Sequence, residues 1–189
     1  MPRPMRVFLD ASVLYPVSLR NLLMRLTLDG LYQARWSPDV HREWIGAVLR
    51  DNLHIPRERL EAIRDAMDDQ AQDALVTGYE RRVGRLLLPD PDDRHMLAAA
   101  IVCGARVIVT RNLRDFPADK LTPFRIEALH PDVFLRRLLD RSPQAVADAV
   151  RSQHARLRNP PLPMADLLAV FLRLDLVETV AALRRSMPE

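Results

Sequence analysis

The chain has 189 residues, of which 48% are hydrophobic and 28% are charged, so it can bury one sizeable core and carry a small appendage, and a disordered or fibrous chain is excluded. Its five glycines form no Gly-x-Gly pair, which excludes a dinucleotide-binding fingerprint and a Walker-type phosphate loop. The single cysteine, Cys103, excludes an internal disulfide framework and a Cys-rich zinc cluster. The net charge is only +3, but Lys120 is the sole lysine among the 28 basic residues. Arginine binds phosphate with two parallel hydrogen bonds, but genomic base composition is the simpler explanation of such a bias, so charge alone does not establish a nucleic-acid partner.

The sequence predicts a soluble, cytoplasmic protein. Residues 7–9 are the only apolar stretch near the amino terminus, and they are too few for the core of a signal peptide. The longest uncharged apolar run, residues 96–105, is about half of the roughly 20 residues that a membrane-spanning helix needs. We therefore expect no membrane association.

The first elements predict the opening of an α/β unit. Residues 7–9 indicate a short buried strand that ends at Asp10. Leucines recur at near-helical spacing over residues 19–28, and Asp29 with Gly30 indicates the helix end. A second short strand is expected at residues 32–36.

A second helix is expected after Ser37, which can cap it, and Pro38, which suits a first helical position. Trp44 lies on the apolar stripe of this helix, and Glu43 lies at the edge of the stripe. Residues 56–80 indicate one or two solvent-facing helices of mixed charge with no site chemistry.

The most informative stretch runs from residue 86 to residue 116. Residues 86–88 predict a strand, and Asp90 can cap a helix that begins with residues 91–93, is apolar all round and stops at Gly104. Residues 107–109 predict a buried strand that ends at Thr110, followed by a polar turn placed where open parallel sheets bind their ligands. A last strand is expected within residues 125–129.

From Asp132 onward the pattern indicates helices without strands. Four helices are expected, with a proline-rich break at residues 159–163 and a capping box formed by Asp175 and Glu178 before the last helix. We therefore divide the chain into a domain of residues 1–131 and a helical extension of residues 132–189. Because Phe171 belongs to an apolar stripe, the extension is expected to dock on the first domain or on a partner.

Four acids fall at the ends of elements that a parallel sheet would bring together: Asp10, Glu43, Asp93 and Asp115. Clustered carboxylates raise one another's pKa unless a cation lies between them, and oxygen ligands without His or Cys favour Mg²⁺ or Mn²⁺. Such a metal can activate a bound water and stabilise charge on phosphate oxygens, so the chemistry implied is metal-dependent phosphodiester hydrolysis.

Each acid also has a structural explanation. Asp90 and Asp93 suit a helix amino terminus, Asp115 can form an Asx-turn, and Glu43 can be a solvated helix residue. Asp10 is harder to explain in this way, because an acid that ends an apolar strand is poorly placed for solvent. Taken without any resemblance, the four acids leave the metal site and the purely structural explanation equally open.

Three ordered motifs resemble the PIN domain of nucleases, most of all the toxin component of VapBC-type toxin–antitoxin systems. They are residues 7–14 (VFLDASVL), 90–100 (DPDDRHMLAAA) and 109–116 (VTRNLRDF). The resemblance covers about two thirds of the chain and implies a three-layer α/β/α fold around a central parallel sheet. The helical extension resembles one seen in some PIN toxins.

The resemblance also implies the site. By motif position, Asp10, Glu43, Asp93 and Asp115 take the family's acidic places around Mg²⁺ or Mn²⁺, with Ser12, Thr110 and Asn112 as polar support. Some PIN proteins carry an acid where this chain has Asn112, which leaves the number of metals open. Arg94, Arg111 and Arg114 flank the acids, and we expect them to contact substrate phosphate.

These observations favour an endoribonuclease that is the toxin of a toxin–antitoxin pair. The expected substrate is RNA and the expected partner is an antitoxin protein, and the possibility of a homodimer is left open. A DNA or flap nuclease with the same site is one alternative, since four acids do not distinguish ribose from deoxyribose. A catalytically silent interaction protein that works through its helical extension is another. A phospho-acceptor receiver domain fits poorly, because Lys120 is followed by no clear strand.

Overall fold

A parallel four-stranded sheet lies at the centre of the computed structural model, which describes residues 4–157 and 162–187. The strand order is β2-β1-β3-β4, with β1 at Arg6–Leu9, β2 at Gln33–Arg35, β3 at Val107–Val109 and β4 at Glu127–Leu129. In the register, Phe8 pairs with Arg35 on one side and with Ile108 on the other. Residues 7–9 are fully buried, as expected for a central parallel strand that is covered on both faces.

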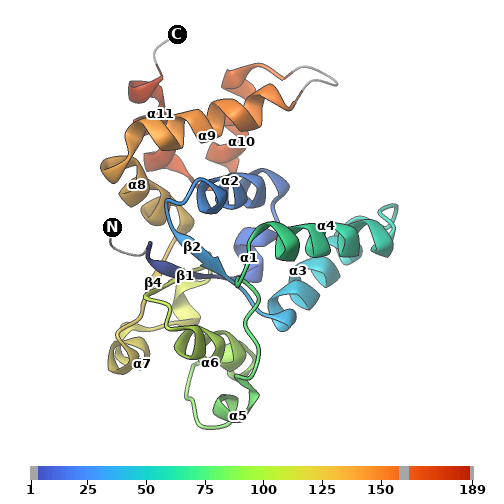
Figure 1. Ribbon diagram of the computed structural model, residues 1–189, viewed down its shortest axis with the longest axis vertical. Helices are drawn as coiled ribbons and strands as arrows, with labels where there is room; N and C mark the ends of the chain where they lie inside the picture. The colour runs from blue at the N-terminus through green and yellow to red at the C-terminus, as the bar shows by residue number, and fades with distance from the viewer. Residues whose placement is uncertain (1–3, 158–161, 188–189) are drawn as a thin grey trace.

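Helices cover both faces of the sheet (Figure 1). One layer contains α1 (Ala11–Leu14), α2 (Val17–Leu28), α3 (Pro38–Asp51) and α4 (Arg57–Gln70). The other contains α5 (Glu80–Val83), α6 (Arg94–Cys103) and α7 (Ala118–Leu121). Three single 3-10 turns, η1 (Pro91–Asp93), η2 (Leu113–Asp115) and η3 (Thr122–Phe124), join elements on this second side. The three-layer α/β/α architecture with a central parallel sheet is thus confirmed.

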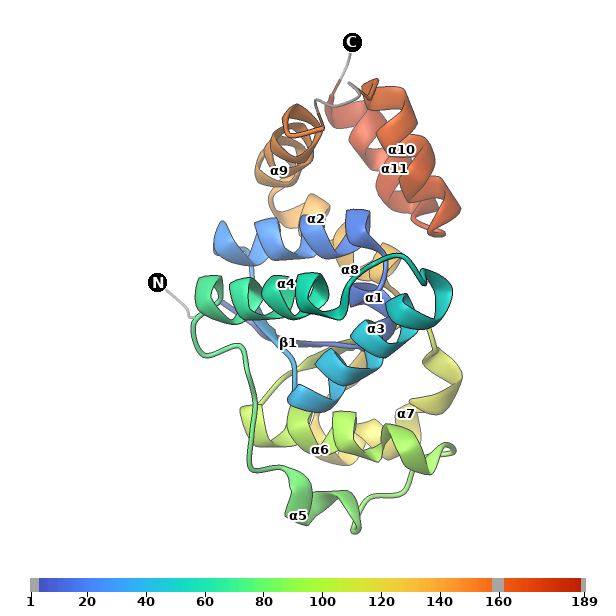
Figure 2. The ribbon, with the colours of Figure 1, turned by 90° about the vertical axis from the view of Figure 1, so that its right-hand side faces the viewer.

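The extension is helical throughout its described residues. It contains α8 (Pro131–Arg141), α9 (Pro143–Ala155), α10 (Met164–Arg173) and α11 (Val177–Ser186), and Figure 2 shows the last three stacked beyond α2. The rings of Tyr32 and Phe134 meet edge to face at 5.1 Å, and Gln153 Nε2 donates to the carbonyl of Ser18 at 3.0 Å. The expected docking on the first domain is therefore observed. The division at residue 131 stays a prediction, and most of the expected proline break at residues 159–163 lies outside the described residues.

The expected strand at residues 86–88 is wrong. These residues have no regular secondary structure and pair with no strand among the described residues. Leu86 and Leu88 are buried whereas Leu87 is 69% exposed. The segment is therefore a connection between α5 and η1 that packs two of its side chains into the core. A different leucine pairs at the edge of the sheet: Leu75 forms an isolated parallel bridge with Trp36, the residue that follows the edge strand β2.

The capping box expected from Asp175 and Glu178 is also wrong. Asp175 adopts φ 60°, a left-handed conformation just after α10, so it ends that helix rather than starting the next. The amino terminus of α11 is capped from α8, where the buried carboxylate of Asp132 accepts from the backbone N–H groups of Glu178 at 3.0 Å and Thr179 at 2.8 Å. The cap of α11 therefore comes from a side chain that is distant in sequence and not from a local capping box.

Two helices are less uniform than the sequence suggests. α6 stops at Gly104, which has φ 66° as expected, but it is not buried all round, since Val102 is 39% exposed. α4 is not wholly solvent-facing, because Leu60 and Met67 are buried. Within the two described ranges, no helix has the length and apolar character needed to cross a membrane.

Candidate metal centre

Asp10 occupies the junction between the two central strands. It follows β1, and its backbone N–H donates to the carbonyl of Val109 at 3.1 Å. The residue is only 6% exposed, and its Oδ2 accepts hydrogen bonds from Ser12 Oγ and Thr110 Oγ1, both at 2.6 Å. Burial raises the pKa of Asp10, the two hydroxyl groups oppose this rise, and the nearby carboxylate of Glu43 adds to it. Asp10 is thus a fixed carboxylate at the carboxyl edge of the sheet.

The same hydroxyl groups hold the loop that follows β3. Ser12 Oγ accepts from the backbone N–H of Arg111 at 3.1 Å, and Thr110 Oγ1 accepts from that of Asn112 at 2.9 Å. The side-chain amide of Asn112 in turn donates to Asp115 Oδ2. Each of the three residues expected as polar support therefore contacts a carboxylate of the predicted site.

Asp93 and Asp115 come together with a third acid, Asp90. One carboxylate oxygen from each of the three lies within 4.8 Å of the other two. Burial raises the pKa of Asp93 to about 7, and the carboxylates of Asp10, Asp115, Asp90 and Glu43 contribute to the rise. The four acids predicted from the sequence thus act on one another electrostatically.

Asp90 is the residue that sequence reasoning missed as a member of this cluster. It does cap η1 as expected, since Oδ1 accepts from the backbone N–H of Asp92 at 2.9 Å. The same carboxylate also faces Asp93 and Asp115. The available signal was its place in a single helical turn with Asp93, three residues further on, which puts both side chains at the start of α6.

Glu43 acts on the cluster electrostatically from the opposite layer, although its carboxylate is not one of the three whose oxygens lie within 4.8 Å of one another. It lies on α3, and it contributes to the raised pKa of both Asp10 and Asp93. His95 Nε2, from the first turn of α6, lies 2.7 Å from Glu43 Oε1. Glu43 is therefore more than a solvated helix residue.

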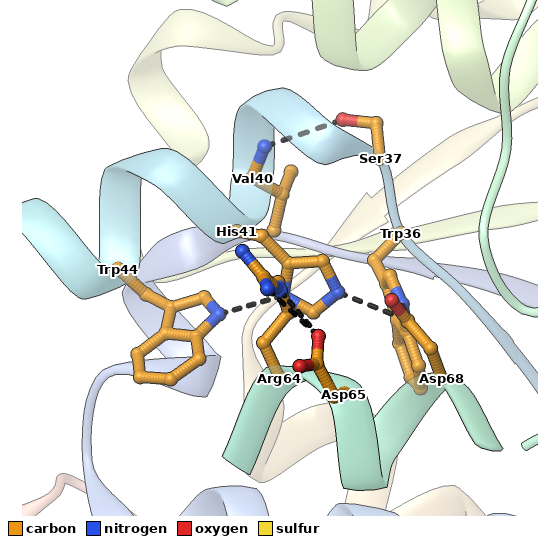
Figure 3. A network of polar contacts seen from close by, with 8 residues as sticks. All are labelled: Trp36, Ser37, Val40, His41, Trp44, Arg64, Asp65 and Asp68. Atoms are coloured by element: carbon orange, nitrogen blue, oxygen red, sulfur yellow. Dashed lines mark hydrogen bonds and ion pairs between the residues drawn. The ribbon is translucent and has the colours of Figure 1, made fainter. Parts of the chain in front are cut away.

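A polar network in the core holds α3, the helix that carries Glu43, against α4 (Figure 3). Trp44 Nε1 donates to His41 Nδ1 at 2.9 Å, which leaves the proton on Nε2 to be donated to Asp68 Oδ1 at 3.1 Å. Trp36 Nε1 donates to the same oxygen of Asp68 at 2.7 Å, and burial lowers the pKa of His41. Both tryptophans are fully buried, so they are core residues with no ring face open to a nucleic-acid base.

The three arginines expected to contact phosphate are placed differently. Arg94 is half-buried, and its Nε has no hydrogen-bond partner among the described residues. Arg114 is exposed on η2. Arg111 Nη2 lies 3.0 Å from Asp175 Oδ2, so the turn between α10 and α11 of the extension touches the loop that follows β3. Their contact with substrate stays a prediction.

The amino-acid sequence matches two known protein families. A profile described as "PIN domain" matches residues 6–114, which is more than half of the chain. The chain belongs to the PIN-domain family. Residues 131–185 match a second profile, described as "VapC50 C-terminal domain", so this PIN protein carries a VapC50-like extension.

A curated relative has the same VapC50 designation as the second profile. A protein named "Putative ribonuclease VapC50", from Mycobacterium tuberculosis, is 45% identical over 76 residues. The alignment spans 40% of this chain and 45% of the relative, less than half of either. A search of the solved structures gives no significant match.

Proposed function

We propose that this PIN-domain protein is an Mg²⁺- or Mn²⁺-dependent endoribonuclease and the toxin of a toxin–antitoxin pair. The observation that carries the proposal is the cluster of carboxylates at the carboxyl edge of the sheet, in which burial, followed by mutual repulsion with the neighbouring carboxylates, raises the pKa of Asp93 to about 7. Such mutual repulsion is relieved by a divalent cation, and carboxylate oxygens are the ligands that Mg²⁺ and Mn²⁺ prefer. The donor set therefore fits the metal that PIN-domain membership implies.

In this proposal Asp10, Asp93 and Asp115 hold the metal, with Asp90 beside them, and Glu43 binds the metal or orients the attacking water. A bound divalent cation supplies an activated water and stabilises charge on the phosphate oxygens. Ser12 and Thr110 fix the carboxylate of Asp10 through two short hydrogen bonds, and Asn112 holds that of Asp115.

The surrounding arginines are proposed to bind the substrate backbone. Arg94 lies next to Asp93 in the chain, and Arg114 next to Asp115, so both can lie along a phosphate chain that passes the acids. Arg111, at the other end of the loop that follows β3, can contact the same phosphate backbone of the substrate. Their contacts are with phosphate, so they hold the substrate in place without reading its sequence.

The role as a toxin is proposed from the VapC50-like sequence, and RNA is proposed as the substrate on the same ground. Purified protein is incubated with labelled single-stranded RNA, single-stranded DNA and a DNA flap of matched sequence, in Mn²⁺ or Mg²⁺. The proposal expects cleavage of RNA above both DNA substrates, and none by the variant Asp115→Asn. Preference for DNA would instead support a DNA or flap nuclease, and no cleavage of any substrate would support an interaction protein.

The toxin proposal has its own test. Expression of the wild-type chain in a bacterial host should arrest growth, and expression of Asp115→Asn should not. Co-expression of a small DNA-binding protein encoded in the neighbouring reading frame should restore growth and co-purify with the wild-type chain. Growth unaffected by active protein would contradict the role as a toxin while leaving the nuclease proposal intact.

A further inference from the structure

His95 is a buried polar residue at the edge of the acid cluster that the proposed chemistry does not use. Its side chain is 12% exposed, and both ring nitrogens are buried without a well-angled hydrogen-bond partner among the described residues. A buried imidazole whose nitrogens make no hydrogen bond reduces the stability of the fold, so the position of His95 beside its neighbours calls for a functional explanation. Those neighbours are two carboxylates of α3.

Glu43 and Asp39 stand one helical turn apart on α3, and His95 lies against both from α6. Nε2 is 2.7 Å from Glu43 Oε1, and Nδ1 is 3.9 Å from Asp39 Oδ2. Asp39 is itself held in place, because the hydroxyl of Tyr79 donates to Oδ2 at 2.5 Å and Arg42 donates to Oδ1. His95 therefore lies between one restrained carboxylate and the carboxylate that faces the proposed metal.

Glu43 needs such a restraint. Its side chain is 43% exposed and has three rotatable bonds, and the carboxylates of Asp10 and Asp93 are near enough to repel it. Repulsion favours rotamers that swing Glu43 toward solvent. When Nε2 of His95 carries a proton, it can donate to Glu43 Oε1, which is 2.7 Å away, and such a hydrogen bond favours the inward position of the carboxylate.

We propose that His95 is a positioning residue that holds the Glu43 carboxylate at the metal centre through the 2.7 Å contact between its Nε2 and Glu43 Oε1. This inference rests on the proposed function, since it concerns the residue that binds metal or orients water. Residues that orient metal ligands typically change metal affinity or activity by about 10- to 100-fold when they are removed.

The test compares His95→Leu, which removes the donor, with His95→Gln, whose amide nitrogen can take the place of Nε2. The exposed His54→Leu is the matched control. Three quantities are measured for each: the melting temperature, the Mn²⁺ dissociation constant by calorimetry, and kcat on single-stranded RNA. We expect His95→Leu to weaken Mn²⁺ binding or kcat by about 10-fold or more, His95→Gln to recover most of the loss, and His54→Leu to match wild type.

A second comparison separates positioning from general support of the fold. If His95 acts through Glu43, then adding His95→Leu to a Glu43→Gln protein should change Mn²⁺ affinity and kcat by less than twofold, because the partner carboxylate is already gone. If His95→Leu fails to fold, His95→Met takes its place as the variant without a donor.

The outcomes are distinct. Equal Mn²⁺ affinity and kcat in His95→Leu and wild type would overturn the inference and leave the proposed function standing. Equal losses with and without Glu43, or no recovery by His95→Gln, would also overturn it, since His95 would then only support packing. A wild-type protein that neither binds Mn²⁺ nor cleaves RNA would overturn the proposed function, and this inference with it.

Discussion

Replacing Asp93 by asparagine tests whether this carboxylate lies in a cluster of mutually repelling acids. Its pKa rises from 3.8 to about 7 through burial and through the neighbouring carboxylates, of which Asp10 and Asp115 contribute most. Each pKa unit corresponds to about 1.4 kcal/mol, so a fully shielded group would be destabilised by about 4 kcal/mol when ionised. Asp93 is only half-buried, and solvent screening reduces this to about 2 kcal/mol.

The sign follows from proton binding. An acid with a higher pKa in the folded protein binds its proton more tightly there, so between about pH 4 and pH 7 the folded Asp93 holds more protons than the unfolded one. The free energy of unfolding of the metal-free wild type therefore falls as pH rises through this window. Asparagine has no charge to lose, so Asp93→Asn removes the penalty above pH 7 and changes little near pH 4.

One loss opposes this gain. Asp93 precedes the first residue of α6, and a negative charge at that end of a helix is worth roughly 0.3 to 1 kcal/mol. The net stabilisation of Asp93→Asn at pH 8 is then about 1 kcal/mol, or roughly 2 to 4 °C in Tm for a chain of this size. The exposed neighbour Asp92 provides the control, since Asp92→Asn should show no such gain.

The assay is thermal unfolding of wild type, Asp93→Asn and Asp92→Asn at pH 5 and pH 8, each in EDTA and in Mn²⁺. Wild type should gain about 2.7 kcal/mol when Mn²⁺ reaches 100 times its dissociation constant, and Asp93→Asn should gain less. An Asp93→Asn protein that is less stable than wild type in EDTA at pH 8, with an undiminished Mn²⁺ effect, would refute the reasoning. Asp93 would then be a structural cap.

Three further substitutions test other parts of the account. Arg111→Gln should raise KM for RNA and reduce the slope of log K against log salt by about 0.7, as expected for one lost phosphate contact to a single strand, and an unchanged slope would contradict that contact. Asp132→Ala should lower the free energy of unfolding by about 1 to 2 kcal/mol in chemical denaturation, because the first N–H groups of α11 lose their acceptor, whereas a neutral effect would show that water replaces it. Asp68→Leu should cost about 1 to 3 kcal/mol because it leaves Trp36 Nε1 and His41 Nε2 unpaired, and full stability would show that the network in α3 and α4 is dispensable.

The strands and the main helices could be predicted because their signals are local. Residues 7–9 and 107–109 are continuous apolar runs that end in a polar residue, and a strand buried on both faces has this pattern. Gly104 marks the end of α6 because its left-handed conformation suits glycine. The carboxyl ends of parallel strands meet at one edge, so Asp10 and Thr110 could be expected to lie together.

Contacts that depend on how side chains of distant elements pack could not be predicted. The cap of α11 comes from Asp132, 46 residues before Glu178, and no local sequence pattern predicts it. The segment at residues 86–88 has the composition of a strand, but a strand also needs a free partner edge. His95 has no metal-ligand spacing with another histidine, and its closeness to Glu43 follows only from the packing of α3 and α6 across the site.

The central claim is that the acid cluster is a divalent-cation site at which RNA is cleaved. The most direct measurement uses protein stripped with EDTA and then titrated with Mn²⁺, while cleavage of a labelled single-stranded RNA is followed. The account predicts no cleavage in EDTA, recovery as Mn²⁺ is added, and no recovery for Asp10→Asn. Cleavage that continues unchanged in EDTA, or that Asp10→Asn retains, would contradict it.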